Sequence, residues 1–142
     1  MSDRTVVVHT AVVDTPLLLG DVVDRVTGPS VGGLGVFVGV VRDNDEDKPV
    51  RSLDYTAHPT AAEELAACVR RVTARHDVWA AAVEHRIGHL AVGDLAVVVA
   101  VGAGHRGPAL ECCRELIDTL KVEVPIWKEQ TFDDGAVSWV GA

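Results

Sequence analysis

The order of strand-like and helix-like segments is the feature of this sequence that most constrains its fold. Apolar, β-branched segments of strand length mostly come in adjacent pairs, and three segments with the apolar spacing of a helix separate them. The resulting order is β-α-β-β-α-β-β-α-β-β. Because consecutive strands outnumber the helices, this order favours an α+β fold with mainly antiparallel strands and three helices over a doubly wound parallel sheet.

Local signals set the bounds of these segments. The predicted strands cover residues 5–13, 32–42, 50–57, 78–88 and 94–103, and a final hairpin turns at Asp134-Gly135. The predicted helices cover residues 14–28, 58–77 and 108–121.

Single residues mark the starts and breaks of these elements. Pro16 and Pro108 suit the starts of their helices, while Thr60 and Glu63 have the spacing of a capping box. The glycines of residues 32–42 indicate a bulge or the close approach of another backbone, and DNDEDK after them predicts an acidic loop.

The composition limits the classes of protein. A chain of 142 residues with 48% hydrophobic residues is expected to form one domain, residues 1–142, with a substantial core. No apolar run reaches the roughly 18 to 20 residues of a membrane helix, and the N-terminus lacks the pattern of a signal peptide, so a cytoplasmic protein without membrane contact is expected. The net charge of −8 argues against binding to nucleic acid, but a local basic site would attract an anionic ligand.

Common catalytic motifs are missing from the sequence. There is no P-loop, no G-x-S-x-G and no H-E-x-x-H motif, and no serine or cysteine stands beside an obvious base. Cys68, Cys112 and Cys113 form no C-x-x-C pair and are predicted to be buried thiols. The histidines are scattered, so neither a metal site nor another cofactor is expected. In the pair His85-Arg86, strand alternation directs only one side chain inward, and neither is assigned a catalytic role.

One candidate anion site lies in the segment GAGHRGPALECC. Glycines surround His105 and Arg106 immediately before a predicted helix, where free backbone N–H groups and the helix dipole favour an anion. Arg106 has the forked geometry that suits phosphate or carboxylate, and a histidine such as His105 can bind or transfer a proton. An ordinary strand-to-helix loop with exposed polar side chains is the alternative that this motif alone leaves open.

The segment LKVEVPIWKEQ holds two of the three lysines in the chain. Pro125 prevents the predicted helix from continuing, so an extended segment follows. Lys121 has a structural explanation, because a cation is favourable at the end of a helix. Lys128 is either partly desolvated near other cations, which would lower its pKa and suit it to act as acid, base or nucleophile, or simply buries its stem while the ammonium reaches water.

Arg42 and Phe37 are further candidates near the acidic segment. Arg42 ends a predicted strand and pairs either with a ligand or with the neighbouring Asp43 or Asp45. Phe37 packs either against a flat ligand or in the core, and the core is the simpler explanation. Together these observations indicate that any chemistry uses lysines and a cationic pocket rather than a resident thiol.

Five segments occur in an order that resembles the large, catalytic subunit of molybdopterin synthase. They are FVGVVRD, LDYTAHPTAAEEL, HRIGHLAVGD, VAVGAGHRGPALECCRELIDTLK and VPIWKE, and the resemblance spans about residues 5 to 140. The His105-Arg106 loop and the K-x-x-x-P-I-W-K segment are its most specific parts. The resemblance implies a fold of the α/β-hammerhead type.

The same resemblance implies a role in molybdenum cofactor biosynthesis. In this family, sulfur from the C-terminal thiocarboxylate of a small ubiquitin-like sulfur carrier ending in Gly-Gly is transferred to cyclic pyranopterin monophosphate, which forms the dithiolene of molybdopterin. The implied assembly is a heterotetramer, in which a homodimer of this subunit carries one small subunit at each end. The substrate phosphate and the anionic tail both match a positive pocket in an acidic protein. A non-catalytic anion-binding or scaffold module of the same fold is the alternative.

The resemblance also assigns roles to residues. It implies that Lys121 and Lys128 are catalytic and that Arg42, His105 and Arg106 bind the pterin phosphate, and Phe37 is kept as a further substrate-binding candidate.

Some positions depart from the family pattern. Tyr55 is followed by Thr-Ala-His, where the family often has Glu-Ala-Tyr. Glu129 and Gln130 follow the PIWK motif, where a basic residue and then a glutamate are common. These differences bear on how the tail of the partner docks, and they leave the proposed lysines unchanged.

Overall fold

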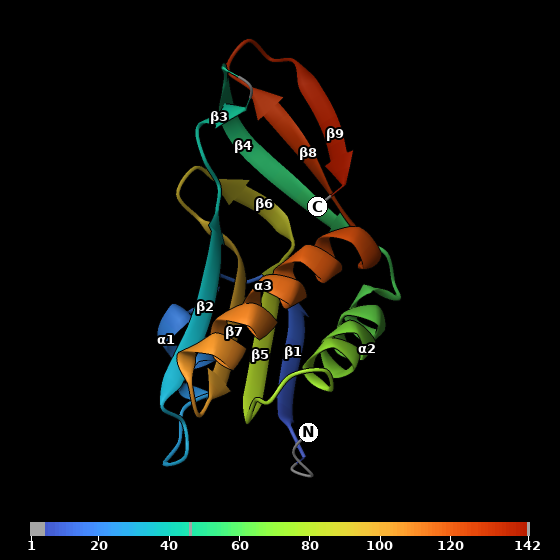
Figure 1. Ribbon diagram of the computed structural model, residues 1–142. Coiled ribbons are helices and arrows are strands. Elements are labelled where there is room, and N and C mark those ends of the chain that lie inside the picture. Colours follow the sequence, from blue (N-terminus) through green and yellow to red (C-terminus); the bar gives the residue numbers. More distant parts are fainter. Residues whose placement is uncertain (1–4, 46, 142) are drawn as a thin grey trace.

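The computed structural model of the protein describes residues 5–45 and 47–141 (Figure 1). Its elements in chain order are β1 (Val7–Val13), α1 (Leu19–Asp24), β2 (Gly33–Val40), β3 (Asn44–Asp45), β4 (Lys48–Ala57), α2 (Ala61–Thr73), β5 (Ala80–Arg86), β6 (Gly88–Ala91), β7 (Leu95–Ala103), α3 (Arg106–Glu123), β8 (Ile126–Phe132) and β9 (Val137–Gly141). Among the described residues, no helix is both long and apolar enough to span a bilayer.

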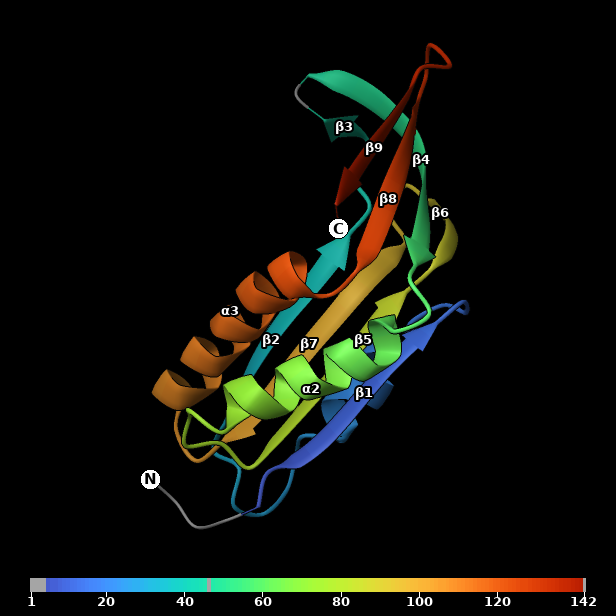
Figure 2. The same cartoon turned by 90° about the vertical axis from the view of Figure 1, so that its right-hand side faces the viewer.

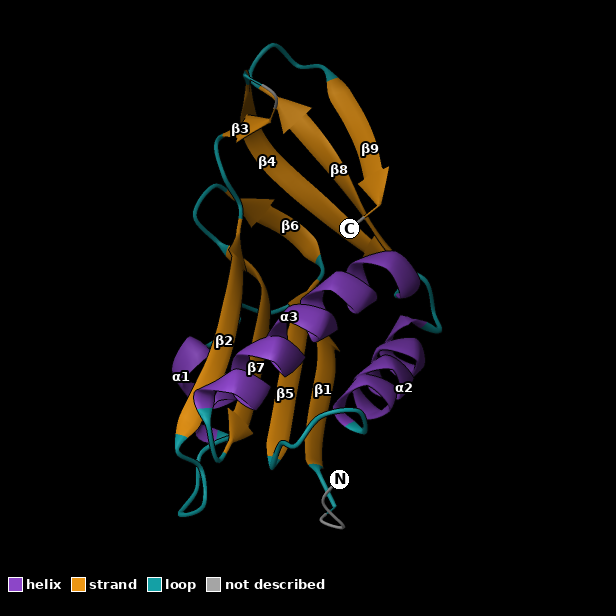
Figure 3. Cartoon of the chain, in the orientation of Figure 1, coloured by secondary structure: helices purple, strands orange, loops and turns teal. Residues whose placement is uncertain are grey.

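The strands form two sheets. The first has the order β1-β5-β7-β2, and the second has the order β3-β4-β8-β9, with β6 also paired to β4. β1 runs parallel to β5, whereas the other pairs are antiparallel. In Figures 1 and 3 the second sheet lies beyond the C-terminal end of α3. Over the described residues this confirms the predicted α+β fold with three helices and mainly antiparallel strands.

The helices cover the two faces of the first sheet unequally. α2 and α3 pack on one face, and the short α1 lies on the other (Figure 2). β7 contributes to both layers because its side chains alternate: Val97, Val99 and Val101 pack beneath α2 and α3, and Val98 and Ala100 pack toward α1. Burial on both faces explains why the sequence of this strand is an unbroken apolar run.

Glycines allow α3 to lie very close to β2. A Cβ atom at Gly35 would lie 2.3 Å from the carbonyl oxygen of Ala109, and one at Gly33 would lie 3.2 Å from the backbone nitrogen of Arg106. The close backbone approach predicted from the glycines is therefore confirmed. As a result, α3 follows β2 from its Gly33 end to the end that leads into Arg42.

The sequence pattern misses two short strands. β3 lies in the acidic segment predicted as a loop, and β6 occupies residues predicted as a turn. Both pair with β4, so their extended backbone is explained by a neighbouring strand rather than by local residue preference. The predicted hairpin at the C-terminus is confirmed: β8 and β9 pair antiparallel, and Gly135 has a φ of +84°, which glycine adopts without strain.

At the starts of α1 and α2 the predicted local signals are not used as expected. α1 begins at Leu19 and not near Pro16, because the residue before Leu19 is still extended. Thr60 stands at the start of α2, but its hydroxyl caps no backbone N–H. It donates instead to the carboxylate of Glu64 at 2.5 Å, so the predicted capping box with Glu63 is wrong.

Candidate active site

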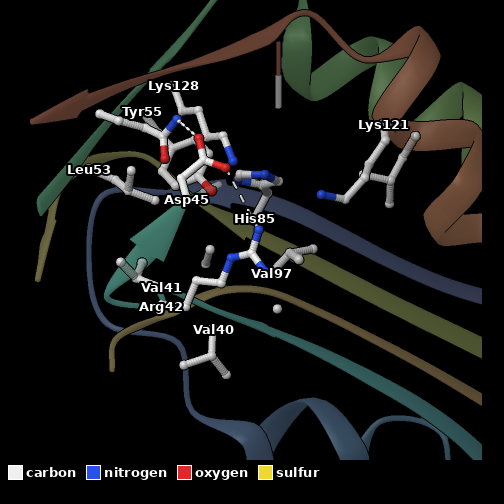
Figure 4. Close-up of a pocket in the computed structure, with 14 residues that line it drawn as sticks. Val40, Val41, Arg42, Asp45, Leu53, Tyr55, His85, Val97, Lys121 and Lys128 are labelled. Carbon is white, nitrogen blue, oxygen red and sulfur yellow. Dashed lines mark hydrogen bonds and ion pairs between the residues drawn. The ribbon is translucent and has the colours of Figure 1, made fainter. Parts of the chain in front are cut away.

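A small pocket lies where the two sheets meet beside the last turn of α3 (Figure 4). Its volume is about 130 Å³. The polar side chains that line it are Arg42, Asp45, Tyr55, His85, Lys121, Lys128 and Gln130. The structure thus brings Arg42 and the two lysines together, although 79 residues separate Arg42 from the nearer lysine in the sequence.

The break between α3 and β8 positions the two lysines. Lys121 lies in the last turn of α3, and the backbone becomes extended at Val124, with φ −86° and ψ 125°. β8 then pairs with β4, where Lys128 lies opposite Tyr55. Because side chains alternate along a strand, Lys128 faces the pocket while Trp127 points to the other side of the sheet, where it is exposed.

Lys128 is a pocket cation whose surroundings shift its pKa. Burial of its half-buried ammonium lowers its pKa, the nearby charges of Lys121 and Arg42 lower it further, and the carboxylate of Asp45 opposes them. The deprotonated amine is therefore more accessible near neutral pH than in an exposed lysine. Of the two interpretations left open by the sequence, the perturbed amine fits this environment better than a stem that merely reaches water.

The other two cations of the pocket are more exposed. Lys121 projects from the end of α3 with its nitrogen directed toward the pocket (Figure 4). Arg42 has a largely exposed side chain, and its Nη2 lies 3.8 Å from Oδ1 of Asp45. The predicted pairing of Arg42 with an acidic neighbour is thus confirmed for Asp45, and the same guanidinium also lines the pocket.

His85 is a pocket residue to which sequence reasoning gave no role. It is almost fully buried, and its ring meets that of Tyr55 edge to face at 5.1 Å. Its Nδ1 lies 2.8 Å from the carbonyl oxygen of Arg86 and must donate to it, which leaves Nε2 as an acceptor. Burial, reinforced by the charge of Lys121, lowers the His85 pKa and favours the neutral ring.

Strand alternation is the signal in the sequence that could have identified His85 as an inward-facing residue. Alternation along β5 places Ala81, Val83 and His85 on one face, and the first two pack beneath α2 and α3. The unbroken apolar run of residues 80–83 hides this alternation, because both faces of the strand are buried there.

His105 and Arg106 lie at the opposite end of α3. The helix begins at Arg106, two residues before the predicted start, and both side chains are exposed. Fifteen residues separate Arg106 from Lys121, which at the rise of an α-helix is about 22 Å. Within one chain, the structure therefore does not bring His105 and Arg106 to the lysines.

Phe37 and the three cysteines are the remaining residues for which the sequence made a prediction. Phe37 is 37% exposed on β2, so the interpretation as a core residue is wrong; its ring lies beside Gly39, which lines the pocket. The cysteines are buried and unpaired, as expected. Burial raises the pKa of Cys112 to about 12 and that of Cys113 to about 11, so neither is a thiolate near neutral pH.

Comparison with protein families gives one match over most of the chain. A family model described as MoaE protein matches residues 12–123. The match includes Arg42, His105, Arg106 and Lys121, and it ends before Lys128.

Individual proteins extend this similarity beyond residue 123. A molybdopterin synthase catalytic subunit from Halalkalibacterium halodurans is 37% identical over 132 residues, which cover 92% of this chain and 84% of the relative. The crystal structure of molybdopterin synthase from Staphylococcus aureus superposes with a TM-score of 0.84 at 28% identity, covering 92% of this chain and 96% of the other. A structure described as a complex of subunits 1 and 2 of molybdopterin-converting factor from Helicobacter pylori has a similar fold, with a TM-score of 0.62, 21% identity, and coverage of 80% and 73%.

Proposed function

The chain belongs to the MoaE protein family and acts in molybdenum cofactor biosynthesis, and from this premise we propose that it is the sulfur-transferring subunit of molybdopterin synthase. The proposed reaction moves sulfur from the C-terminal thiocarboxylate of a small ubiquitin-like partner to cyclic pyranopterin monophosphate and forms the dithiolene. A cytoplasmic location is part of the same proposal.

The observation that carries this proposal is the convergence of three cations in one pocket of an acidic protein. Arg42, Lys121 and Lys128 face the same space in a chain with a net charge of −8. Both proposed guests are anionic, one through a phosphate and the other through a thiocarboxylate. Fixed cations in a partly desolvated pocket attract such groups and stabilise charge that develops during reaction.

The surroundings of the two lysines suggest different roles. Lys121 is more exposed, and its side chain can hold an anionic oxygen or sulfur. Lys128, whose pKa is lowered by burial and by the neighbouring cations, exchanges a proton more readily near neutral pH. The acceptor nitrogen of His85 offers a further place for a proton in the same pocket.

The size of the pocket suggests that a second copy completes the site. Ligand pockets usually enclose about 300 to 1,000 Å³, whereas this one has about 130 Å³. Its volume suits the narrow tail of a partner or a single anionic group better than a whole pterin. We therefore propose that His105 and Arg106 of a second copy in a homodimer bind the substrate phosphate, since those of the same chain are about 22 Å away.

The edge of the first sheet offers a geometry for such a homodimer. β2 is the last strand of that sheet, and its exposed apolar side chains are Leu34, Val36, Phe37 and Val40. Its Gly33 end lies beside Arg106, and its other end leads into Arg42. If two copies pair their β2 edges antiparallel about a two-fold axis, Arg106 of each copy approaches Arg42 of the other.

The proposed partner is a small ubiquitin-like sulfur carrier with a C-terminal Gly-Gly. The Helicobacter pylori structure contains two subunits of molybdopterin-converting factor, which supports an assembly of this kind for a protein of similar fold. With one carrier bound at each end of the homodimer, the assembly would be a heterotetramer.

The test is a reconstituted reaction. The purified protein is mixed with a thiocarboxylated small subunit and cyclic pyranopterin monophosphate, and dithiolene formation is measured for the wild type, Lys121→Ala and Lys128→Ala. Loss of one preorganised charged group is expected to lower the rate about 10²- to 10³-fold. Lys48→Ala is the matched control, because Lys48 lies outside the pocket, pairs with Asp134 at 3.2 Å and covers the ring of Phe132.

Two outcomes would contradict this proposal. Full activity of both pocket variants would remove the lysines from the mechanism. No product from the wild type, with a partner verified to carry the thiocarboxylate, would favour the non-catalytic scaffold.

A further inference from the structure

Asp45 is the one carboxylate among the described residues that line the cationic pocket. It lies on β3, three residues after Arg42, and its side chain is partly buried. Gln130, which is 4% exposed, donates a hydrogen bond of 2.8 Å from Nε2 to Oδ2 of Asp45. The other carboxylate oxygen lies 3.8 Å from Arg42 (Figure 4). A buried amide from a distant strand thus fixes this carboxylate toward the cations.

Other acidic residues of the same segment are placed differently. Asp43 and Asp47 are exposed, and neither lines the pocket. The general acidity of the segment therefore does not explain the position of Asp45. Its orientation depends on β8, which brings Gln130 and Lys128 to the same face of the second sheet.

The charge of Asp45 acts on the groups that an anionic guest would use. It opposes the lowering of the Lys128 pKa by burial and by the neighbouring cations. Its two oxygens also offer Arg42 and Lys128 the same kind of partner that a phosphate or a thiocarboxylate would offer. An anion that enters the pocket must therefore compete with this carboxylate for the cations.

We propose that Asp45 is a positioning residue that serves as an internal counter-anion, holding the pocket cations in place until a phosphate or thiocarboxylate group displaces it. The identity of the phosphate and thiocarboxylate guests rests on the proposed function. The competition between Asp45 and an entering anion does not depend on it. Two consequences follow: Asp45 weakens the binding of anions, and it favours the ammonium form of Lys128 in the empty pocket.

The first test measures anion binding with inorganic phosphate as the probe. Asp45→Asn removes the charge and keeps a carbonyl oxygen that can accept from Gln130. Asp43→Asn makes the same change of net charge at an exposed position of the same segment. By titration calorimetry at low ionic strength, Asp45→Asn is expected to bind phosphate about three- to tenfold more tightly than the wild type, and Asp43→Asn less than about twofold more tightly, because exposed charges are screened.

The second test follows Lys128 itself. The titratable groups that line the pocket with Lys128 and Asp45 are Arg42, Tyr55, His85 and Lys121. The acylation rate of Lys128 is measured against pH by peptide mass spectrometry. Its midpoint is expected to move to lower pH in Asp45→Asn and to stay in place in Asp43→Asn, because removing a nearby negative charge destabilises the ammonium. A purely structural role for Asp45 would not move this midpoint selectively.

The outcomes separate this inference from the proposed function, because neither measurement needs the partner or turnover. Phosphate affinity that is unchanged or weaker in Asp45→Asn, or an acylation midpoint shared with Asp43→Asn, overturns the counter-anion role even if the sulfur-transfer assay succeeds. Asp45→Ser provides a second removal of the charge and is expected to bind phosphate more tightly as well. Weaker binding by Asp45→Ser, with the fold verified by circular dichroism, would overturn the inference too.

Discussion

The two ends of α3 carry cationic side chains in contrasting surroundings. At the C-terminal end, Lys121 faces a pocket that already contains Lys128 and Arg42. At the N-terminal end, His105 and Arg106 are exposed to solvent. The helix dipole favours a cation at the first end and an anion at the second. Backbone N–H groups are free only at the N-terminal end, where they add to the positive charge of Arg106.

This difference shows what burial adds to charge. Burial lowers the pKa of Lys128, which makes its deprotonated amine easier to form, and it lowers the pKa of His85, which favours the neutral ring with an acceptor nitrogen. The exposed Arg106 at the other end can hold an anion, but water screens its charge. One chain thus separates a half-buried cluster with shifted pKa values from an exposed end of α3, and the proposed function uses both.

The largest expected effect is a change in activity when the mutation at one end of the site is carried by one chain of a dimer and the mutation at the other end by its partner. Lys128→Ala and Arg106→Ala homodimers are each expected to have little activity, the former through the turnover rate and the latter through weaker substrate binding. When the two variants are co-expressed, half of the dimers contain one intact composite site, which restores about a quarter of wild-type activity. Dithiolene formation by the mixed protein measures this.

A control accompanies the mixing experiment. Lys128→Ala mixed with a double variant that lacks both Lys128 and Arg106 should restore nothing. If the first mixture is as inactive as this control, the two ends do not act across a dimer.

The next largest expected effect is a loss of stability when the close contact between α3 and β2 is disturbed. In Gly35→Ala, the new methyl group would meet the carbonyl oxygen of Ala109 at 2.3 Å, so backbones must move apart. Overpacking of this kind costs about 1–3 kcal/mol of unfolding free energy, measured by denaturant titration. Gly20→Ala in α1 is the control, because nothing lies within 4 Å of its added methyl group. Equal stability of the two variants would show that the close contact does not hold α3 in place.

A smaller effect is the pH dependence of stability at the lysine end. The Lys128 pKa is lower in the folded chain than in the unfolded chain, whose lysines titrate near 10.5. Between the folded and unfolded pKa values the unfolded chain binds more protons, so unfolding free energy rises with pH in this alkaline window, and the charged form destabilises the fold below it. Lys128→Met should lack this rise, whereas Lys48→Met should retain it, as measured by denaturant titrations from neutral pH to pH 10. An equal rise in Lys128→Met would assign the effect to another group.

The smallest expected effect is at a surface ion pair near the same end of α3. Glu123 accepts a hydrogen bond of 2.5 Å from Arg71 of α2, and both side chains are about half exposed. Glu123→Gln is expected to lower unfolding free energy by less than about 1 kcal/mol and to leave turnover unchanged. Loss of turnover would mean that the general charge at this end matters, and not the pocket alone.

The sequence supported much of the fold because its signals were local. The unbroken apolar run of β7 and the Asp134-Gly135 turn are specified by adjacent residues, and both are confirmed. The predictions fail where local signals compete with distant ones: Thr60 has a capping spacing, but its hydroxyl is used by Glu64. β3 has no strand pattern of its own and forms because β4 lies beside it.

By itself, the sequence determined the local setting of the two lysines in this segment. A lysine-poor, acidic chain places Lys121 and Lys128 around a proline that must break a helix, and this fixes one lysine at a helix end and the other on the following strand.

Only the tertiary structure decided which groups share a pocket. It joins Arg42, Asp45 and His85 to the lysines and leaves His105 and Arg106 about 22 Å away at the other end of α3. The physical reason is that pKa values and anion affinity depend on burial and on charges within a few ångströms, and the pairing of distant strands sets those distances.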